Sequence, residues 1–216
     1  MEPHIKAVIW DFGGVVSTSP FEAFNAYEAE RGLPRDFIRS VNARNPDENA
    51  WARLERSQVG AEGFDELFRS ESAALGHEVP GRDILALLAG RLRPRVVEAL
   101  KACKVHAKAG CITNNAPIGK GASMTEDAGR ASEVESVFAL FDHVIESSKL
   151  GIRKPDPRIY ALMCEALEVE PQDCVYLDDL GINLKPARAM GMTTIKVLSE
   201  DQLLADLSQA TGLEFS

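Results

Sequence analysis

The spacing of hydrophobic and polar residues changes twice along the chain. Near the start, Ile5–Trp10 is a short apolar run with β-branched residues, and it stops at Asp11. Such a run predicts a buried strand that leads into a loop. From about residue 20 to residue 91 the apolar positions repeat only at helical spacing, as in Phe64, Leu67 and Phe68. After Pro94, strand-like and helix-like segments alternate.

The helix-only region opens with a helix-start signal. Ser19 can cap a helix, Pro20 suits the first turn, and Glu22 completes a capping box. Gly32 is placed to end this helix. Further helices are expected around Phe37–Val41, Trp51–Leu54, Phe64–Phe68 and Ile84–Leu88. No strand is expected in this region.

The last region predicts a parallel sheet. Helices are expected at Val96–Lys104, Arg158–Leu167 and Leu184–Met190. One strand is expected to end at Ile112-Thr113, and three more are expected at His143–Ile145, Cys174–Leu177 and Thr194–Val197. Strands that alternate with helices are typical of a doubly wound sheet. The polar, glycine-rich stretch Pro117–Ser132 is interpreted as a long loop.

These patterns together predict an α/β fold, a doubly wound parallel sheet of the Rossmann-like kind with an inserted all-helical domain. The α/β core is expected to comprise residues 1–16 and 93–216, and the inserted helical domain residues 17–92.

Composition narrows the class of protein. The chain has 216 residues, a net charge of -9 and four cysteines without metal-binding spacing. A chain of this length buries roughly 70% of its unfolded surface and needs no disulfide. The negative net charge argues against a nucleic-acid partner. No apolar run approaches the roughly 20 residues of a membrane span. The N-terminus lacks a signal-peptide pattern. We expect a cytoplasmic protein with no membrane partner, and leave its oligomeric state open.

Polar residues follow three of the predicted strands. They are Asp11, the pair Thr113-Asn114 and the pair Asp178-Asp179, and Lys154 lies in a nearby loop. Singly, each is more often a turn former or a solvated charge. Because the carboxyl ends of parallel strands meet at one edge of a sheet, the set is expected to converge. Crowded carboxylates repel one another unless a cation joins them, and hard oxygen ligands suit Mg²⁺.

In order and spacing, these residues resemble the four motifs of the haloacid dehalogenase (HAD) superfamily. Asp11–Val15 resembles the nucleophile loop, Thr113-Asn114 the second motif, Lys154-Pro155 the third and Asp178-Asp179 the fourth. The helical insertion resembles the cap domain of such enzymes. The stretch Glu146–Met192 is similar to the N-terminal phosphatase domain of soluble epoxide hydrolase.

The resemblance implies a Mg²⁺-dependent phosphohydrolase with a small phosphorylated molecule as its substrate. Asp11 would attack phosphorus and become an aspartyl-phosphate. The Asp11 and Asp179 carboxylates and the Gly13 carbonyl would bind Mg²⁺, with Asp178 orienting that shell or binding through water.

The remaining motif residues would handle the phosphate group. Thr113 and the backbone of Asn114 would hold phosphate oxygens. Lys154 would bind the phosphate, neutralise the crowded anions and stabilise the transition state, so it is a catalytic candidate beside Asp11.

Gly13 departs from the resemblance. Most phosphatases of this superfamily have a second Asp there, which protonates the leaving group and then activates water. Such acid–base assistance is worth about 10²–10⁴-fold. Three explanations stay open: substrates with good leaving groups, a proton supplied by a cap residue or water, or a domain that binds ligands without catalysis.

Two other functions compete with phosphate hydrolysis. One is hydrolytic dehalogenation of a 2-haloacid, which uses an Asp nucleophile without a metal. The other is a catalytically impaired ligand-binding or regulatory domain. Some cap side chains could face a substrate, but we interpret them as solvated helix surface; they are Arg39, Arg44, Asn45, Arg53 and Glu55.

Overall fold

The core of the protein is a five-stranded parallel sheet. The computed structural model describes residues 5–88, 90–115 and 128–215. Its strands follow the spatial order β3-β2-β1-β4-β5. They are β1 (Ala7–Trp10), β2 (Lys108–Thr113), β3 (His143–Glu146), β4 (Cys174–Asp178) and β5 (Thr193–Lys196). The predicted α/β fold with a parallel sheet is confirmed.

Strand β1 is the centre of the sheet. It pairs in parallel with both β2 and β4, and Trp10 lies opposite Cys111 and Leu177. All of its side chains are buried, which is why the sequence shows a continuous apolar run rather than alternation. The residue that follows β1, Asp11, therefore emerges at the middle of the sheet edge.

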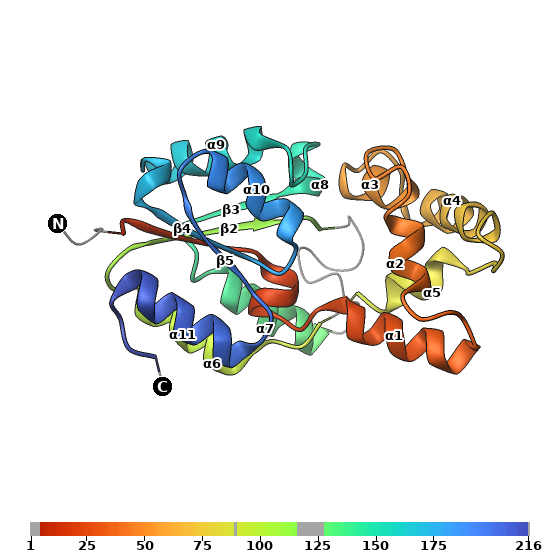
Figure 1. Ribbon diagram of the computed structural model, residues 1–216, viewed down its shortest axis with the longest axis horizontal. Helices are drawn as coiled ribbons and strands as arrows, with labels where there is room; N and C mark the ends of the chain where they lie inside the picture. Colours follow the sequence, from red (N-terminus) through yellow and green to blue (C-terminus); the bar gives the residue numbers. More distant parts are fainter. Residues whose placement is uncertain (1–4, 89, 116–127, 216) are drawn as a thin grey trace.

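Two layers of helices cover the sheet (Figure 1). One layer contains α6 (Pro94–Lys104), α7 (Ala128–Phe138) and α11 (Glu200–Thr211), and the other contains α9 (Pro157–Leu167) and α10 (Gly181–Ala189). Val8 and Trp10 pack into the first layer, whereas Ala7 and Ile9 pack into the second. Successive residues of a strand point to opposite faces, so β1 serves both cores. A short helix, α8 (Ser147–Leu150), and a 3-10 turn (Pro171–Asp173) complete this part of the chain.

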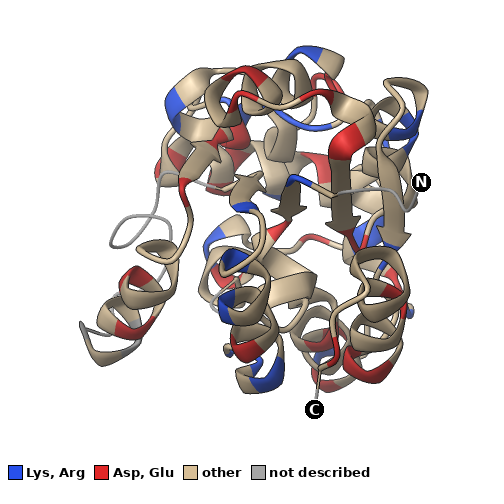
Figure 2. Ribbon diagram, turned by 90° about the vertical axis from the view of Figure 1, so that its left-hand side faces the viewer, with Lys and Arg blue, Asp and Glu red and all other residues tan. Residues whose placement is uncertain are grey.

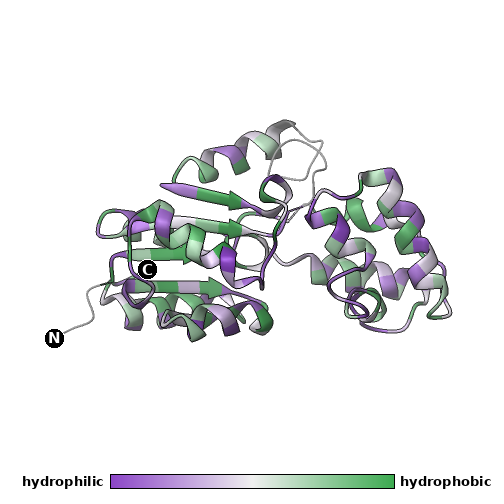
Figure 3. Cartoon of the chain, turned by 90° about the horizontal axis from the view of Figure 1, so that it is seen from above, coloured by the Kyte–Doolittle hydropathy of each residue, from purple (hydrophilic) through white to green (hydrophobic). Residues whose placement is uncertain are grey.

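A separate lobe of helices lies beyond the carboxyl ends of the strands. It contains α1 (Pro20–Arg31), α2 (Phe37–Asn42), α3 (Ala50–Glu55), α4 (Ala61–Ala73) and α5 (Gly81–Ala86). The strand arrows point toward it in Figure 3. The lobe has its own apolar cluster, which includes Phe24, Ile38 and Phe64. The described part of residues 17–92 forms no strand beyond one isolated bridge.

Two neighbouring connections join the lobe to the core. Ser17 and Leu92 form an antiparallel bridge. The Thr18 amide donates to the Arg91 carbonyl (2.8 Å), and the Arg93 amide donates to the Val16 carbonyl (2.9 Å). The outgoing and returning chain are thus fastened to each other at the sheet edge where the lobe begins.

Two of the longer helices differ from the expectation. Residues 128–132, interpreted as part of a loop, begin helix α7, while residues 117–127 of that stretch lie outside the described residues. The correction has a physical reason, because Ala131, Val134 and Val137 recur at helical spacing and are buried. Helix α11 was not predicted, although Ser199 caps it by accepting from the Gln202 amide (3.3 Å).

The surface charge is distributed over both parts of the protein. Acidic and basic residues occur on the helices of the core and of the lobe (Figure 2). None of the described helices is both long enough and apolar enough to cross a membrane.

Candidate active site

Three carboxylates meet where β1 and β4 end. Asp11, Asp178 and Asp179 each offer one carboxylate oxygen, and these oxygens lie within 4.8 Å of one another. Burial raises the pKa of Asp11 well above its usual range; Lys154 opposes this shift, and the two neighbouring carboxylates add to it. Burial also raises the pKa of Asp179 to about 6. The site therefore favours a positive charge among these oxygens.

Lys154 supplies one such charge. Its side chain is 1% exposed, and its Nζ lies 2.8 Å from Asp11 Oδ1 and 2.8 Å from Asp178 Oδ2. Burial alone would lower the pKa of Lys154, but the Asp11 and Asp178 carboxylates raise it above its ordinary value. The side chain is thus a buried ammonium group that bridges two motifs.

Asp178 is fully engaged by hydrogen bonds. Its Oδ1 accepts from the Leu180 amide (2.8 Å) and from Asn183 Nδ2 (3.0 Å). Its Oδ2 accepts from Lys154 Nζ and from the Tyr176 hydroxyl. A metal ion would have to displace some of these donors to bind Asp178 directly. The sequence motifs do not include Tyr176 or Asn183, which sit two residues before and five residues after Asp178.

Asp11 and Asp179 are less constrained. Asp11 Oδ1 accepts from the Phe12 amide (2.6 Å) and contacts Lys154, while no hydrogen bond from the described residues reaches Oδ2. Asp179 Oδ2 accepts from Ser19 Oγ at 3.4 Å. These two carboxylates could hold a cation between them, because oxygen donors of this kind suit a hard divalent ion.

The two glycines after Asp11 have different constraints. Gly13 has φ -70° and ψ 128°, and a Cβ there would have no atom within 4 Å. Gly14 has φ 81°, and a Cβ there would lie 2.3 Å from Asp179 Oδ2. Only glycine allows both this backbone conformation and this close approach. Gly14, which the sequence did not single out, lets the first and fourth motifs come together.

The second motif fixes the lysine loop. Thr113 is the last residue of β2 and is buried. Asn114 Oδ1 accepts from the Lys154 amide (2.9 Å), and its Nδ2 donates to the Lys154 carbonyl (3.1 Å). The Asn114 side chain thus binds the lysine backbone on both sides. The structure brings all of the predicted site residues to one edge of the sheet.

One residue of the helical lobe that we interpreted as solvated surface is buried. Glu55 is 4% exposed and lies 2.7 Å from Arg153 Nε, whereas Arg39, Arg44 and Asn45 are exposed and Arg53 is half-buried. The reason is tertiary: helix α3 ends against the segment around α8, as Figure 1 shows, so the core covers Glu55.

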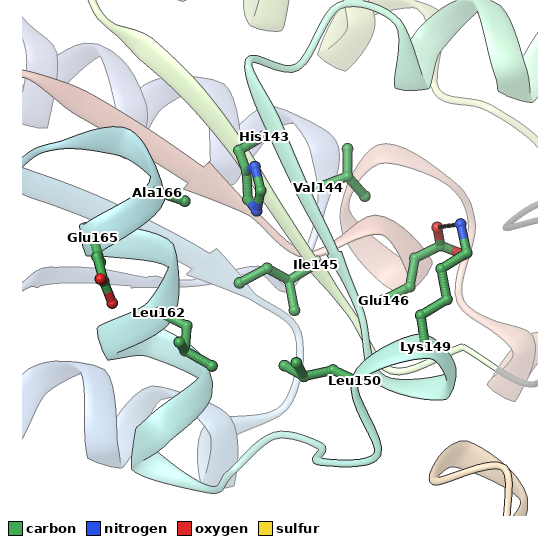
Figure 4. A pocket seen from close by; sticks show the side chains of 9 residues that line it. All are labelled: His143, Val144, Ile145, Glu146, Lys149, Leu150, Leu162, Glu165 and Ala166. Atoms are coloured by element: carbon green, nitrogen blue, oxygen red, sulfur yellow. Dashed lines mark hydrogen bonds and ion pairs between the residues drawn. The ribbon is translucent and has the colours of Figure 1, made fainter.

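A mostly apolar groove lies elsewhere, beside strand β3. It has a volume of about 510 Å³, and its lining includes Val144, Ile145, Leu150 and Leu162 from β3, α8 and α9 (Figure 4). No predicted site residue lines it. The carboxylate cluster, rather than this groove, is the candidate active site.

The sequence matches the model of one known protein family. Residues 5–191 match the family described as haloacid dehalogenase-like hydrolase. Bifunctional epoxide hydrolase 2 of Mus musculus is 30% identical over 222 residues, and the match covers 98% of this chain but only 40% of that protein. The protein named phosphatase MT3486, from Mycobacterium tuberculosis (strain CDC 1551 / Oshkosh), is 29% identical over 226 residues, with 94% of each chain covered.

A solved structure shares the fold. The crystal structure of a HAD family enzyme from Bacteroides thetaiotaomicron, in complex with magnesium and inorganic phosphate, is similar with a TM-score of 0.57. The two chains are 16% identical, and the match covers 91% of this chain and 96% of the other.

The two glycines provide a matched test of the site geometry. We expect Gly14→Ala to destabilise the protein, by about 1–2 kcal/mol from the left-handed backbone alone and by more from contact with Asp179. Gly13→Ala, with ordinary dihedral angles and free space, is expected to change stability by less than about 0.5 kcal/mol. Urea unfolding of both variants measures the difference. Equal stabilities would contradict the described approach of Gly14 to Asp179.

Proposed function

The chain belongs to the haloacid dehalogenase-like hydrolases, and from this membership we propose that it is a Mg²⁺-dependent phosphohydrolase of small phosphate esters. The observation that carries the proposal is the buried Lys154, which joins Asp11 to Asp178 while leaving Asp11 Oδ2 without a hydrogen bond from the described residues. The similarity to a mycobacterial phosphatase along nearly the whole chain supports it.

Asp11 is the proposed nucleophile. Lys154 and the Phe12 amide hold its Oδ1, so Oδ2 is the oxygen that attacks phosphorus. The attack forms a bond from Oδ2 to phosphorus, breaks the ester bond and releases the alcohol. Water then hydrolyses the aspartyl-phosphate and regenerates the carboxylate. Lys154 stabilises the negative charge in both steps, and Thr113 and the Asn114 backbone hold phosphate oxygens.

The carboxylates of Asp11 and Asp179 and the carbonyl of Gly13 are the proposed Mg²⁺ ligands. The fit rests on their chemistry, since carboxylates within 4.8 Å of one another are hard oxygen donors. When bound, Mg²⁺ supplies the positive charge that lets a carboxylate approach an anionic phosphate. Asp178 acts on the site by orienting Lys154, and any bond it makes to the metal is through water.

The helical lobe is the proposed cap. We assign residues 1–16 and 93–216 to the catalytic core and residues 17–92 to the cap, with hinges near Ser17 and Leu92. The bridge between these two residues supports the assignment, because it gathers both connections into one place. Closing such a lobe over the strand ends excludes water from the reacting groups.

The first test replaces the nucleophile. Asp11→Asn is expected to reduce hydrolysis of p-nitrophenyl phosphate to background, because an amide cannot attack phosphorus. Asp173→Asn is a matched control, since Asp173 binds Lys6 at the opposite end of the sheet. Steady-state rates and circular dichroism of both variants decide the matter. Wild-type-like turnover by Asp11→Asn would refute the mechanism.

The second test concerns the metal. We expect hydrolysis of p-nitrophenyl phosphate to stop in excess EDTA and to return when Mg²⁺ is restored, because a divalent cation is needed to offset the charges of Asp11 and Asp179 next to the phosphate. Activity on a 2-haloacid that persists in EDTA would instead favour the dehalogenase function.

The third test uses Gly13. Without an acid at this position the leaving group departs largely unprotonated, so the rate is expected to fall steeply as the leaving-group pKa rises. Reaction rates for a series of aryl and alkyl phosphates measure this slope. A flat dependence in the wild type would show that another group supplies the proton.

The companion variant restores the acid. Gly13→Asp is expected to fit, because the Gly13 dihedral angles suit any residue and its Cβ space is free. It should accelerate alkyl esters by roughly 10–10³-fold and change the aryl ester little. A folded variant that leaves the alkyl rate unchanged would show that the missing acid does not limit turnover.

A further inference from the structure

An ion pair is buried between the cap and the core. Glu55 is the last residue of α3, and its Oε2 lies 2.7 Å from Arg153 Nε. The side chains are 6% and 21% exposed. The two atoms are not aligned as a hydrogen bond, so the contact is an ion pair. Glu55 Oε1 accepts from Trp51 Nε1 (2.9 Å), which fixes the carboxylate within its own helix.

Two more contacts join the same two segments. Arg153 Nη1 donates to the Pro46 carbonyl at 3.0 Å, and Ser57 Oγ donates to the Ser148 carbonyl. The loops that flank α3 therefore bind the core segment 147–153 on both sides of the ion pair. Among the described residues, Glu55–Arg153 is the only ion pair in this contact.

The bound core segment leads directly to Lys154. The Asn114 side chain holds the Lys154 backbone from the core side. Arg153, its immediate neighbour, is held from the cap side. We propose that Glu55 and Arg153 are positioning residues whose ion pair couples docking of the cap to placement of the Lys154 ammonium. The inference rests on the proposed function, because it is the role of Lys154 that gives the coupling a kinetic effect.

A double-mutant cycle with a non-kinetic readout tests the coupling. The variants are Glu55→Gln, Arg153→Gln and the combination of both. Arg56→Gln is the matched control, because Arg56 donates to Asp47 and Gln58 of the cap rather than to the core. Acrylamide quenching of tryptophan fluorescence reports on Trp51, since the other tryptophan, Trp10, is fully buried in the central strand of the core.

Each single variant is expected to increase quenching of Trp51. The combined variant should increase it little further, because both changes remove the same ion pair. In p-nitrophenyl phosphate hydrolysis with Mg²⁺, kcat should fall about 10-fold in each variant while KM changes less, as expected for a displaced catalytic group. Arg56→Gln should match the wild type in both measurements.

Additive effects of the two single variants, or unchanged quenching, would overturn the inference. An inactive wild type with non-additive quenching would reject the proposed function and the kinetic coupling, but not the ion pair itself. If Glu55→Gln does not fold, Arg153→Lys tests the role of the ion pair instead. Retained kcat in this charge-conserving variant supports the pair, and a loss as large as in Arg153→Gln contradicts it.

Discussion

Repulsion between carboxylates at the ends of β1 and β4 is the constraint on which the rest of the site depends. Asp11, Asp178 and Asp179 are brought within 4.8 Å of one another, and the buried ammonium of Lys154 joins two of them. Removing one partner of such a buried pair typically costs about 3–5 kcal/mol, because an uncompensated charge is left inside the protein. The hydrogen bonds of Asn114 to the Lys154 backbone and the donors around Asp178 keep this lysine in place.

Much of this arrangement could be predicted from the sequence, because the strands of a parallel sheet are apolar throughout and these strands stop abruptly at polar residues. From that pattern we predicted that Asp11, Thr113 and Asp178 lie at one edge of the sheet. Lys154 has no periodic signal, and only its resemblance to a known motif identified it. Tyr176 looks like an ordinary core residue of β4, although its hydroxyl binds Asp178. Glu55 looks like helix surface, because only the packing of α3 against the core buries it.

In the proposed mechanism, the core and the cap have different roles. All three carboxylates of the cluster lie at the edge of the sheet. The proposed roles of the cap are therefore to exclude water, to select a substrate and to hold the loop that contains Lys154 in position. Ser19, at the start of the cap, and Arg153, at the edge of the core, are the points where the two parts meet the site. In the proposed mechanism, Gly13 offers the leaving group no acid from the nucleophile loop, so we expect the chemistry of the substrate to decide the rate.

Detection of the covalent intermediate tests the central claim most directly. A single turnover of p-nitrophenyl phosphate with Mg²⁺ is stopped in acid after milliseconds, and peptides of the protein are analysed by mass spectrometry. Our account predicts a phosphoryl group on Asp11 that appears with the burst of p-nitrophenol and decays at the turnover rate. A phosphoryl group on another residue, or product release with no phosphorylated Asp11 at any time, would contradict it.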